Sequence, residues 1–217
     1  MTATRSRRGF YHGGICLITD RNSCPLTVLE MARVALEAGI TWLQYRDKSR
    51  DRLAAFRTAR ALREITMEHG ACLVINDYAD IAVAVGADGV HLGQEDLPAR
   101  EARKVTGVRM IIGISTHSVE EARAAEDEGA DYIGFGPVFH TNTKDAGAAR
   151  GVEELRSIRD SVGIPVVAIG GINVDNCASV FEGGASAVAA ASSVLSGDVR
   201  GNVCGFVERI ERLSRSA

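Results

Sequence analysis

Eight short apolar segments, separated by stretches with helical period, constrain the fold of this chain more than any other feature of its sequence. They span residues 14–20, 41–47, 71–77, 89–94, 110–115, 132–138, 165–171 and 187–193. Several are rich in β-branched residues and most are bounded by Gly, Asp or Asn, which is typical of buried parallel strands. Helical periodicity appears between them, for example at 25–38, 51–69, 118–128, 151–161 and 199–213. The alternation predicts a βα unit repeated eight times.

Four related phrases support this prediction, namely EAGITW, AVGADGV, DEGADYI and EGGASAV. Each joins the end of an expected helix to a new strand through glycine, which tolerates the left-handed turn needed there. A chain of 217 residues without a low-complexity linker has room for one barrel. We therefore predict a single (β/α)8 TIM barrel over residues 14–217, preceded by a flexible segment at 1–13. A doubly wound open sheet of the same elements is the alternative.

The composition of the chain argues against binding to nucleic acid and against insertion into a membrane. The 25 Lys and Arg residues against 28 Asp and Glu give a net charge of -3, so no global attraction to nucleic acid is expected. No apolar run reaches the roughly 18 residues of a membrane span, and none of signal-peptide length follows the basic start. The five cysteines form no CxxC pair or zinc spacing, so we expect buried, reduced thiols. These features predict a cytoplasmic protein, and they are compatible with a homo-oligomer.

Polar residues where the strands end are the candidate site, because TIM barrels place their active sites at the carboxyl ends of the strands. Gln44, Arg46 and Lys48 alternate along the second segment, so a strand would turn all three toward one side. The alternative is a solvated edge. Asp77 closes the third segment and Asp96 follows the fourth, and such carboxylates suit Mg²⁺, although Asp is also a common turn residue.

Two further regions predict anion binding. The polar loop at 141–144 is long enough to act as a mobile lid, or else is an ordinary surface loop. Gly171 and Ser192 close the seventh and eighth segments, where barrels often bind phosphate, unless the glycine is only a turn residue. Two anion sites and a metal in one barrel mouth suit a reaction in which diphosphate leaves. Ser115 ends the fifth segment and is a further candidate, and His117, just past it, is a secondary one.

Several motifs together resemble the thiamine-phosphate synthase family. They are QYRDK at 44–48, IND at 75–77, ADGVHLGQED at 87–96, TNTK at 141–144 and AIGGI at 168–172, and the likeness runs from about residue 14 to 195. The resemblance implies a Mg²⁺-dependent transferase that condenses hydroxymethylpyrimidine diphosphate with hydroxyethylthiazole phosphate. The products would be thiamine phosphate and diphosphate, formed through dissociative loss of diphosphate.

The resemblance also implies residue roles, with Arg46, Ser115 and Lys144 as catalytic residues. Gln44 would contact the pyrimidine, and Asp77 and Asp96 would bind Mg²⁺. The diphosphate substrate would be held by Arg46, Lys48, Asn76, Ser115 and Lys144. The thiazole phosphate would be received by Thr141, Asn142, Thr143, Gly171, Ala191 and Ser192.

The chain departs from the family pattern at two places. Asp47 stands where Glu is common, and the Ala run at 189–191 is smaller than usual, so we expect different packing beside the phosphate site. A thiazole tautomerase on the same barrel is the first alternative, but it would need neither the two carboxylates nor Lys144. A non-catalytic phosphate-sensing barrel is the second.

Overall fold

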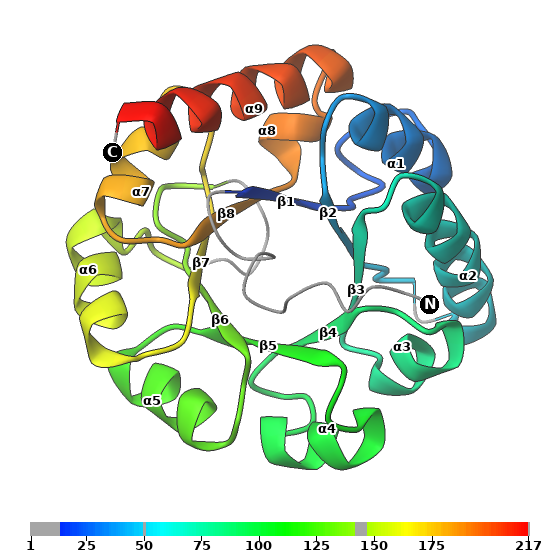
Figure 1. Cartoon of the computed structure of the whole chain (residues 1–217), viewed down its shortest axis with the longest axis horizontal. Helices are drawn as coiled ribbons and strands as arrows, with labels where there is room; N and C mark the ends of the chain where they lie inside the picture. Colours follow the sequence, from blue (N-terminus) through cyan, green and yellow to red (C-terminus); the bar gives the residue numbers. More distant parts are fainter. Residues whose placement is uncertain (1–13, 50, 142–146, 217) are drawn as a thin grey trace.

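The chain folds into a closed barrel of eight parallel strands wrapped by helices. The computed structural model describes residues 14–49, 51–141 and 147–216. The strands follow one another in sequence order around the barrel, and β8 pairs with β1 to close it. Figure 1 shows the helices as an outer ring around the strands. Closure confirms the predicted TIM barrel and excludes the open sheet.

Seven of the predicted apolar segments each contain one strand, and β5 runs one residue past the predicted end at Ser115. The strands are β1 (Gly14–Ile18), β2 (Trp42–Tyr45), β3 (Cys72–Asn76), β4 (Gly89–Leu92), β5 (Ile111–Thr116), β6 (Tyr132–Phe135), β7 (Val166–Ile169) and β8 (Ala187–Ala190). The helices are α1 (Val28–Glu37), α2 (Arg52–Glu68), α3 (Ala79–Val85), α4 (Ala99–Thr106), α5 (Val119–Asp127), α6 (Gly151–Ser161), α7 (Cys177–Glu182), α8 (Ser192–Leu195) and α9 (Val199–Ser216).

Two apolar clusters divide the core. The larger lies between the outer faces of the strands and the helices, and the smaller fills the barrel. The inner cluster includes Trp42 and Tyr132, whose rings meet edge to face at 5.5 Å. Side chains alternate between the two faces of each strand, so the residue types on the inner face decide what the barrel holds.

The four related phrases mark the entrances to β2, β4, β6 and β8. One glycine in each phrase has positive φ, at +114° for Gly39, +64° for Gly86, +88° for Gly129 and +93° for Gly184. This confirms the predicted left-handed turns, which glycine adopts without the Cβ clash that other residues meet. The repeat is thus a local device that reverses the chain from helix to strand.

The aspartates after two of these glycines tie neighbouring strands together. The Asp131 carboxylate accepts hydrogen bonds from the Ile112 N–H at 2.9 Å and from the Arg103 guanidinium at 2.6 Å. Asp88 repeats the arrangement with the Leu73 N–H and Arg63, both at 2.8 Å. Both pairs lie at the amino ends of the strands, away from the predicted site, so they serve stability.

We expect Asp131→Ala to lower the free energy of unfolding by about 2 kcal/mol, because the Ile112 N–H loses its acceptor and the Arg103 guanidinium loses its carboxylate partner. Urea unfolding monitored by circular dichroism measures this. The matched control is Asp160→Ala, since Asp160 pairs with Arg159 in an exposed bridge that is worth under about 0.5 kcal/mol. Equal losses in the two variants would contradict the assigned role of Asp131.

Two predictions need correction, and a third concerns residues that the structure does not describe. The helix expected near Asn173 begins at Cys177, because the side chain of Asn173 accepts the N–H groups of Asp175 and Asn176 in a turn. All five cysteines are free, but Cys204 is exposed and Cys24 is half-buried. Residues 1–13, predicted to be flexible, lie outside the described part of the chain. Within that part, no helix is both long and apolar enough to cross a membrane.

Candidate active site

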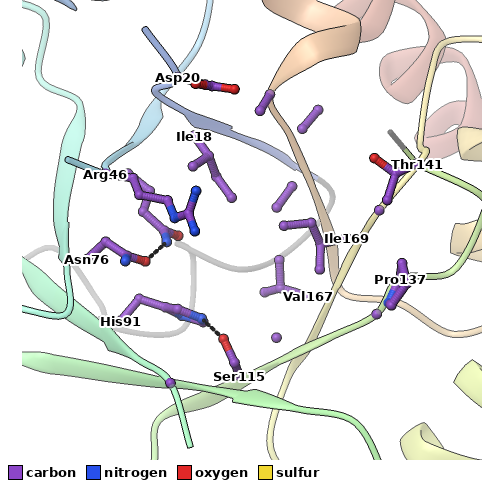
Figure 2. Close-up of a pocket in the computed structure, with 18 of the residues that line it drawn as sticks. Ile18, Asp20, Arg46, Asn76, His91, Ser115, Pro137, Thr141, Val167 and Ile169 are labelled. Carbon is purple, nitrogen blue, oxygen red and sulfur yellow. Dashed lines mark hydrogen bonds between the residues drawn. The ribbon is translucent and has the colours of Figure 1, made fainter. Parts of the chain in front are cut away.

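A cavity of about 720 Å³ opens at the carboxyl ends of the barrel strands. Every strand contributes to its lining, and Figure 2 shows side chains converging on it from around the barrel. Its volume lies within the range of sites that enclose small organic ligands. The cavity therefore coincides with the rim on which the sequence places the candidate residues.

One side of the cavity is a polar arc, formed by Gln44, Asn76, His91 and Ser115 on the successive strands β2 to β5. The Gln44 amide donates to Asn76 Oδ1 at 2.7 Å, and the Asn76 amide donates to Asp77 Oδ1 at 2.5 Å. His91 Nε2 lies 2.9 Å from Ser115 Oγ. Figure 2 draws Arg46, Asn76, His91 and Ser115 along this side. The hydrogen bonds fix the arc before any ligand binds.

The opposite side is an apolar wall. It is formed by Ile18, Val167, Ile169, Ala189 and Ala191 of β1, β7, β8 and the residue after β8. The small alanines of β8, noted above as a departure from the family pattern, form part of this wall. A flat ring with polar edges fits between such surfaces, since the arc satisfies its edge and the wall covers its face.

Asp77 and Asp96 lie at the same edge of the cavity, as predicted, from the turns after β3 and β4. Burial, and secondly the nearby Asp96 carboxylate, raise the pKa of Asp77 to about 6. Asp77 also has a φ of +65°, and the Tyr78 N–H donates across it to the Asn76 carbonyl at 2.8 Å. A strained backbone that holds two like charges together is typical of a cation site.

The mouth of the cavity is acidic in the described part of the chain. Asp20, Asp77, Glu95 and Asp96 line it, and among the described lining residues Arg46 is the only Lys or Arg. Arg46 makes no ion pair with a described residue. Four carboxylates against one guanidinium would repel an anionic ligand, so such a ligand needs further cations at this mouth.

Lys48 does not share the position of Gln44 and Arg46. β2 ends at Tyr45, and Lys48 lies in the following turn, where it is exposed and does not line the described cavity. The period-two prediction was therefore wrong for this residue, because the strand ends three residues earlier. The Asp47 side chain directs the turn by accepting the Ser49 N–H at 2.7 Å and the Tyr45 hydroxyl at 2.8 Å.

The rim at β6, β7 and β8 is built around glycine. Gly170 and Gly171 have φ of +96° and +63°, and a Cβ on Gly171 would lie 2.3 Å from the His140 carbonyl oxygen. Glycine is thus required here because the loop after β6 packs against it. Thr141 of that loop lines the cavity, as do Gly171, Ala191 and Ser192. The predicted residues Asn142, Thr143 and Lys144 lie outside the described residues.

His91 is a cavity residue that the sequence analysis did not select. Its position inside an apolar segment did not indicate a site residue. The available signal was the alternation of His91 with Gly89 and Gly93, which places a polar side chain between two positions without one. Burial lowers the pKa of His91 to about 4, so the imidazole is neutral at physiological pH. His117, the secondary candidate, lines the cavity and its Nδ1 lies 2.9 Å from the Gly136 carbonyl oxygen.

The depressed pKa of His91 predicts how stability depends on pH. Unfolded, the imidazole binds a proton near pH 6.5, whereas in the fold it does so only near pH 4. Stability is therefore lost as pH falls from about 6.5 toward 4, by about 3 kcal/mol for this group. Urea unfolding of the wild type and of His91→Gln between pH 7 and 4.5 measures this. The variant should show the shallower pH dependence, and parallel curves would contradict the prediction.

Comparison with known proteins identifies the family. Residues 15–194 match the thiamine monophosphate synthase family. The chain is 49% identical to thiamine-phosphate synthase from Moorella thermoacetica over 180 residues, which cover 82% of this chain and 86% of that protein. It is 42% identical to thiamine-phosphate synthase from Methanosarcina barkeri over 202 residues, covering 92% and 91%.

The chain belongs to the thiamine monophosphate synthase family. The solved structure of thiamine phosphate pyrophosphorylase from Pyrococcus furiosus has the same fold, with a TM-score of 0.87 and 40% identity. The match covers 95% of this chain and 98% of that one, so the whole barrel is shared. The resemblance seen in the motifs is confirmed, and the activity of this family is that of a transferase.

Proposed function

We propose that this chain joins 4-amino-2-methyl-5-hydroxymethylpyrimidine diphosphate to hydroxyethylthiazole phosphate, giving thiamine phosphate and diphosphate. The observation that carries the proposal is the arrangement of one cavity. A polar arc, a carboxylate pair and Arg46 occupy β2 to β5, and a glycine-built rim occupies β7 and β8. This division provides separate places for the leaving diphosphate and for the phosphate of the second substrate.

The pyrimidine ring is assigned to the space between the polar arc and the apolar wall. Gln44 is 5% exposed, and its amide is oriented by donation to Asn76. An oriented buried amide recognises the donor and acceptor pattern of a heteroaromatic ring, because a mismatched ring would leave its polar atoms unpaired. Gln44 is therefore the proposed contact to the pyrimidine.

The diphosphate is assigned to Arg46, Asn76, Ser115, Lys48 and Lys144. Arg46 is the best supported, since it lines the cavity and forms no salt bridge with a described residue, although its charge partly offsets the rise in the pKa of the nearby Asp77. A guanidinium holds phosphate oxygens in a bidentate manner, which orients the ester as well as balancing its charge. Lys48 is exposed in the described structure, so we assign it to the outer end of the diphosphate.

The carboxylate pair fits Mg²⁺. Asp77 and Asp96 provide hard oxygen donors, and a bound cation would relieve their mutual repulsion. Among the described residues no group of three or more His, Cys, Asp and Glu could hold a metal, which suits an ion that keeps waters and phosphate oxygens as ligands. When bound, Mg²⁺ would neutralise charge on the leaving diphosphate.

The thiazole phosphate is assigned to the rim at β6, β7 and β8. The first N–H groups of α8 lack partners within the helix, and Ser192 and Gly171 line the cavity there. Ser193 Oγ donates to the Ile172 carbonyl at 2.7 Å, which locks the two loops together. The proposed contacts are Thr141, Asn142, Thr143, Gly171, Ala191 and Ser192.

The proposed reaction needs no nucleophile from the protein. The bond between the pyrimidine methylene carbon and the ester oxygen breaks, and diphosphate leaves with the electron pair. The thiazole nitrogen then donates its lone pair to that carbon, which forms the new bond and the positive charge of the thiazolium ring. Arg46 and the polar arc stabilise the separating charges, while the cavity holds the two rings in contact.

The test is incubation of the purified chain with both substrates and Mg²⁺, followed by chromatography for thiamine phosphate and an assay for released diphosphate. Equal amounts of the two products are expected. The thiazole substrate incubated alone provides the arm for a tautomerase, which would isomerise it without any diphosphate. Absence of thiamine phosphate would overturn the proposal.

A further inference from the structure

Three polar side chains inside the barrel form a chain of hydrogen bonds that ends at the cavity. Tyr132 Oη lies 2.9 Å from His91 Nδ1, and His91 Nε2 lies 2.9 Å from Ser115 Oγ. All three residues line the cavity, but Tyr132 is 1% exposed and His91 is 8% exposed, whereas Ser115 is half-buried. Figure 2 shows His91 and Ser115 in contact at the polar side of the cavity. The chain therefore runs from the interior to the polar arc.

Glycines on neighbouring strands make room for both rings. A Cβ on Gly113 would lie 2.1 Å from Tyr132 Cζ, so the phenol occupies the space that a side chain of β5 would fill. A Cβ on Gly134 would lie 3.0 Å from His91 Cε1. Glycine inside a strand destabilises the fold, because its flexible backbone loses more entropy on folding. Gly113 and Gly134 therefore lower stability but leave room for the rings of Tyr132 and His91.

The chemistry of the three groups decides the direction of the hydrogen bonds. The imidazole is neutral, so one ring nitrogen donates and the other accepts. A phenol, with its pKa near 10, is a more acidic donor than an aliphatic hydroxyl, and the serine oxygen is the better acceptor. The favoured pairing has Tyr132 donating to Nδ1 and the Nε2–H donating to Ser115 Oγ.

We propose that Tyr132 and His91 are positioning residues that turn the hydroxyl proton of Ser115 toward the substrate in the cavity. Because Ser115 Oγ accepts from His91, its own proton is directed away from the imidazole. The Ser115 carbonyl also accepts from the Gln94 amide at 2.7 Å, which fixes the main chain at the same point. The hydroxyl thus becomes a donor to the anionic oxygens of the diphosphate, which rests on the proposed function.

The reversed direction has a different consequence. If Nδ1 carried the proton, Ser115 would donate to Nε2 and turn only lone pairs toward the cavity. Lone pairs repel an anionic oxygen, so the two tautomers of His91 differ in whether Ser115 assists or opposes diphosphate. The tautomer of one buried histidine is the quantity to measure.

Nitrogen NMR of the ¹⁵N-histidine-labelled wild type tests the tautomer, with the His91 signals assigned by comparison with His91→Gln. Protonation at Nε2 is expected, and protonation at Nδ1 would overturn the proposal. This measurement uses the free protein and needs no activity. It also decides the matter if Tyr132→Phe fails to fold.

A double-mutant cycle tests the effect on catalysis. We expect Tyr132→Phe to lower kcat about three- to tenfold with KM for either substrate changed less than about twofold, because a hydrogen bond that orients Ser115 is lost. In a Ser115→Ala background the same change should alter kcat by less than about twofold. Equal effects of Tyr132→Phe in both backgrounds would show a merely structural role.

Thr66→Val is the control, since Thr66 is buried and its hydroxyl donates to the Arg63 carbonyl within α2, away from the cavity. Its kcat should stay within about twofold of the wild type. Failure of the wild type to form thiamine phosphate would overturn the proposed function, whereas additive effects in an active protein would overturn the role of Tyr132 and His91. The two failures are therefore distinguishable.

Discussion

Asp77→Asn and Asp96→Asn are each expected to lower turnover about a hundredfold at limiting Mg²⁺, since loss of one carboxylate removes about 3 kcal/mol of the charge stabilisation that a bound metal supplies. Titration of Mg²⁺ in the activity assay should show weaker apparent metal affinity for both variants. Isothermal titration with Mg²⁺ alone checks the same loss without turnover.

The fold should tolerate both substitutions. In Asp77→Asn, the new side chain is among those that best accept the φ of +65° at this position. In Asp96→Asn, the amide oxygen can still accept the hydrogen bond that the Gly93 N–H donates to Asp96 at 2.7 Å. Removal of one charge also relieves the repulsion that raises the pKa of Asp77, so thermal stability without metal should not fall.

Asp20→Asn is the control for these variants, because Asp20 lines the same cavity from the end of β1. Its carboxylate accepts the Asn22 N–H and the Ser23 hydroxyl instead of facing a second carboxylate. A loss of metal affinity as large as that of Asp77→Asn would show a general effect of mouth charge. Unchanged activity and metal dependence in Asp77→Asn and Asp96→Asn would exclude the pair as the Mg²⁺ site.

Arg46→Ala is expected to reduce kcat/KM for the pyrimidine diphosphate about ten- to a hundredfold, because a charge-assisted hydrogen bond to a phosphate is worth about 1.5 to 3 kcal/mol. Arg46 is the only Lys or Arg that lines the described cavity, so no described neighbour replaces it. Steady-state kinetics with each substrate varied in turn measures the effect. The KM for thiazole phosphate should change far less.

Lys48→Ala provides the comparison on the same loop. Lys48 is exposed and does not line the described cavity, so its removal should reduce kcat/KM by a smaller factor than Arg46→Ala. A larger effect of Lys48→Ala would place the diphosphate farther from β2 than proposed. If Arg46→Ala selectively lost affinity for thiazole phosphate, the assignment of the two substrates to the two anion pockets would be reversed.

The fold could be predicted from the sequence because its signals are local. Short apolar runs, helical period and the glycines at positions 39, 86, 129 and 184 each act over a few residues, and together they specify eight βα units. The carboxylate pair could be predicted for the same reason. Asp77 and Asp96 end neighbouring strands, and parallel strands that are neighbours in a barrel end at one rim.

The positions of Lys48 and Gly171 could not be predicted in this way, because they depend on where a strand ends and on which distant loop packs nearby. Lys48 shares its alternation with Gln44 and Arg46, but β2 ends at Tyr45 and no local pattern gave that boundary. Gly171 suggested a phosphate turn from its sequence. Its closest constraint is instead the backbone of residues 139 and 140, which belongs to a loop more than thirty residues earlier.

By itself, the sequence determined the barrel, its helix-to-strand turns and the rim on which polar residues gather, because backbone propensity and hydrophobic period are properties of adjacent residues. Only the tertiary structure decided that Tyr132 fills the space left by Gly113 and reaches His91, which in turn reaches Ser115. Those contacts join the neighbouring strands β4, β5 and β6 on the inner face of the barrel. Their hydrogen bonds depend on where the two rings lie once the barrel has closed. The residues next to Tyr132, His91 and Ser115 in the sequence do not indicate that these three side chains meet.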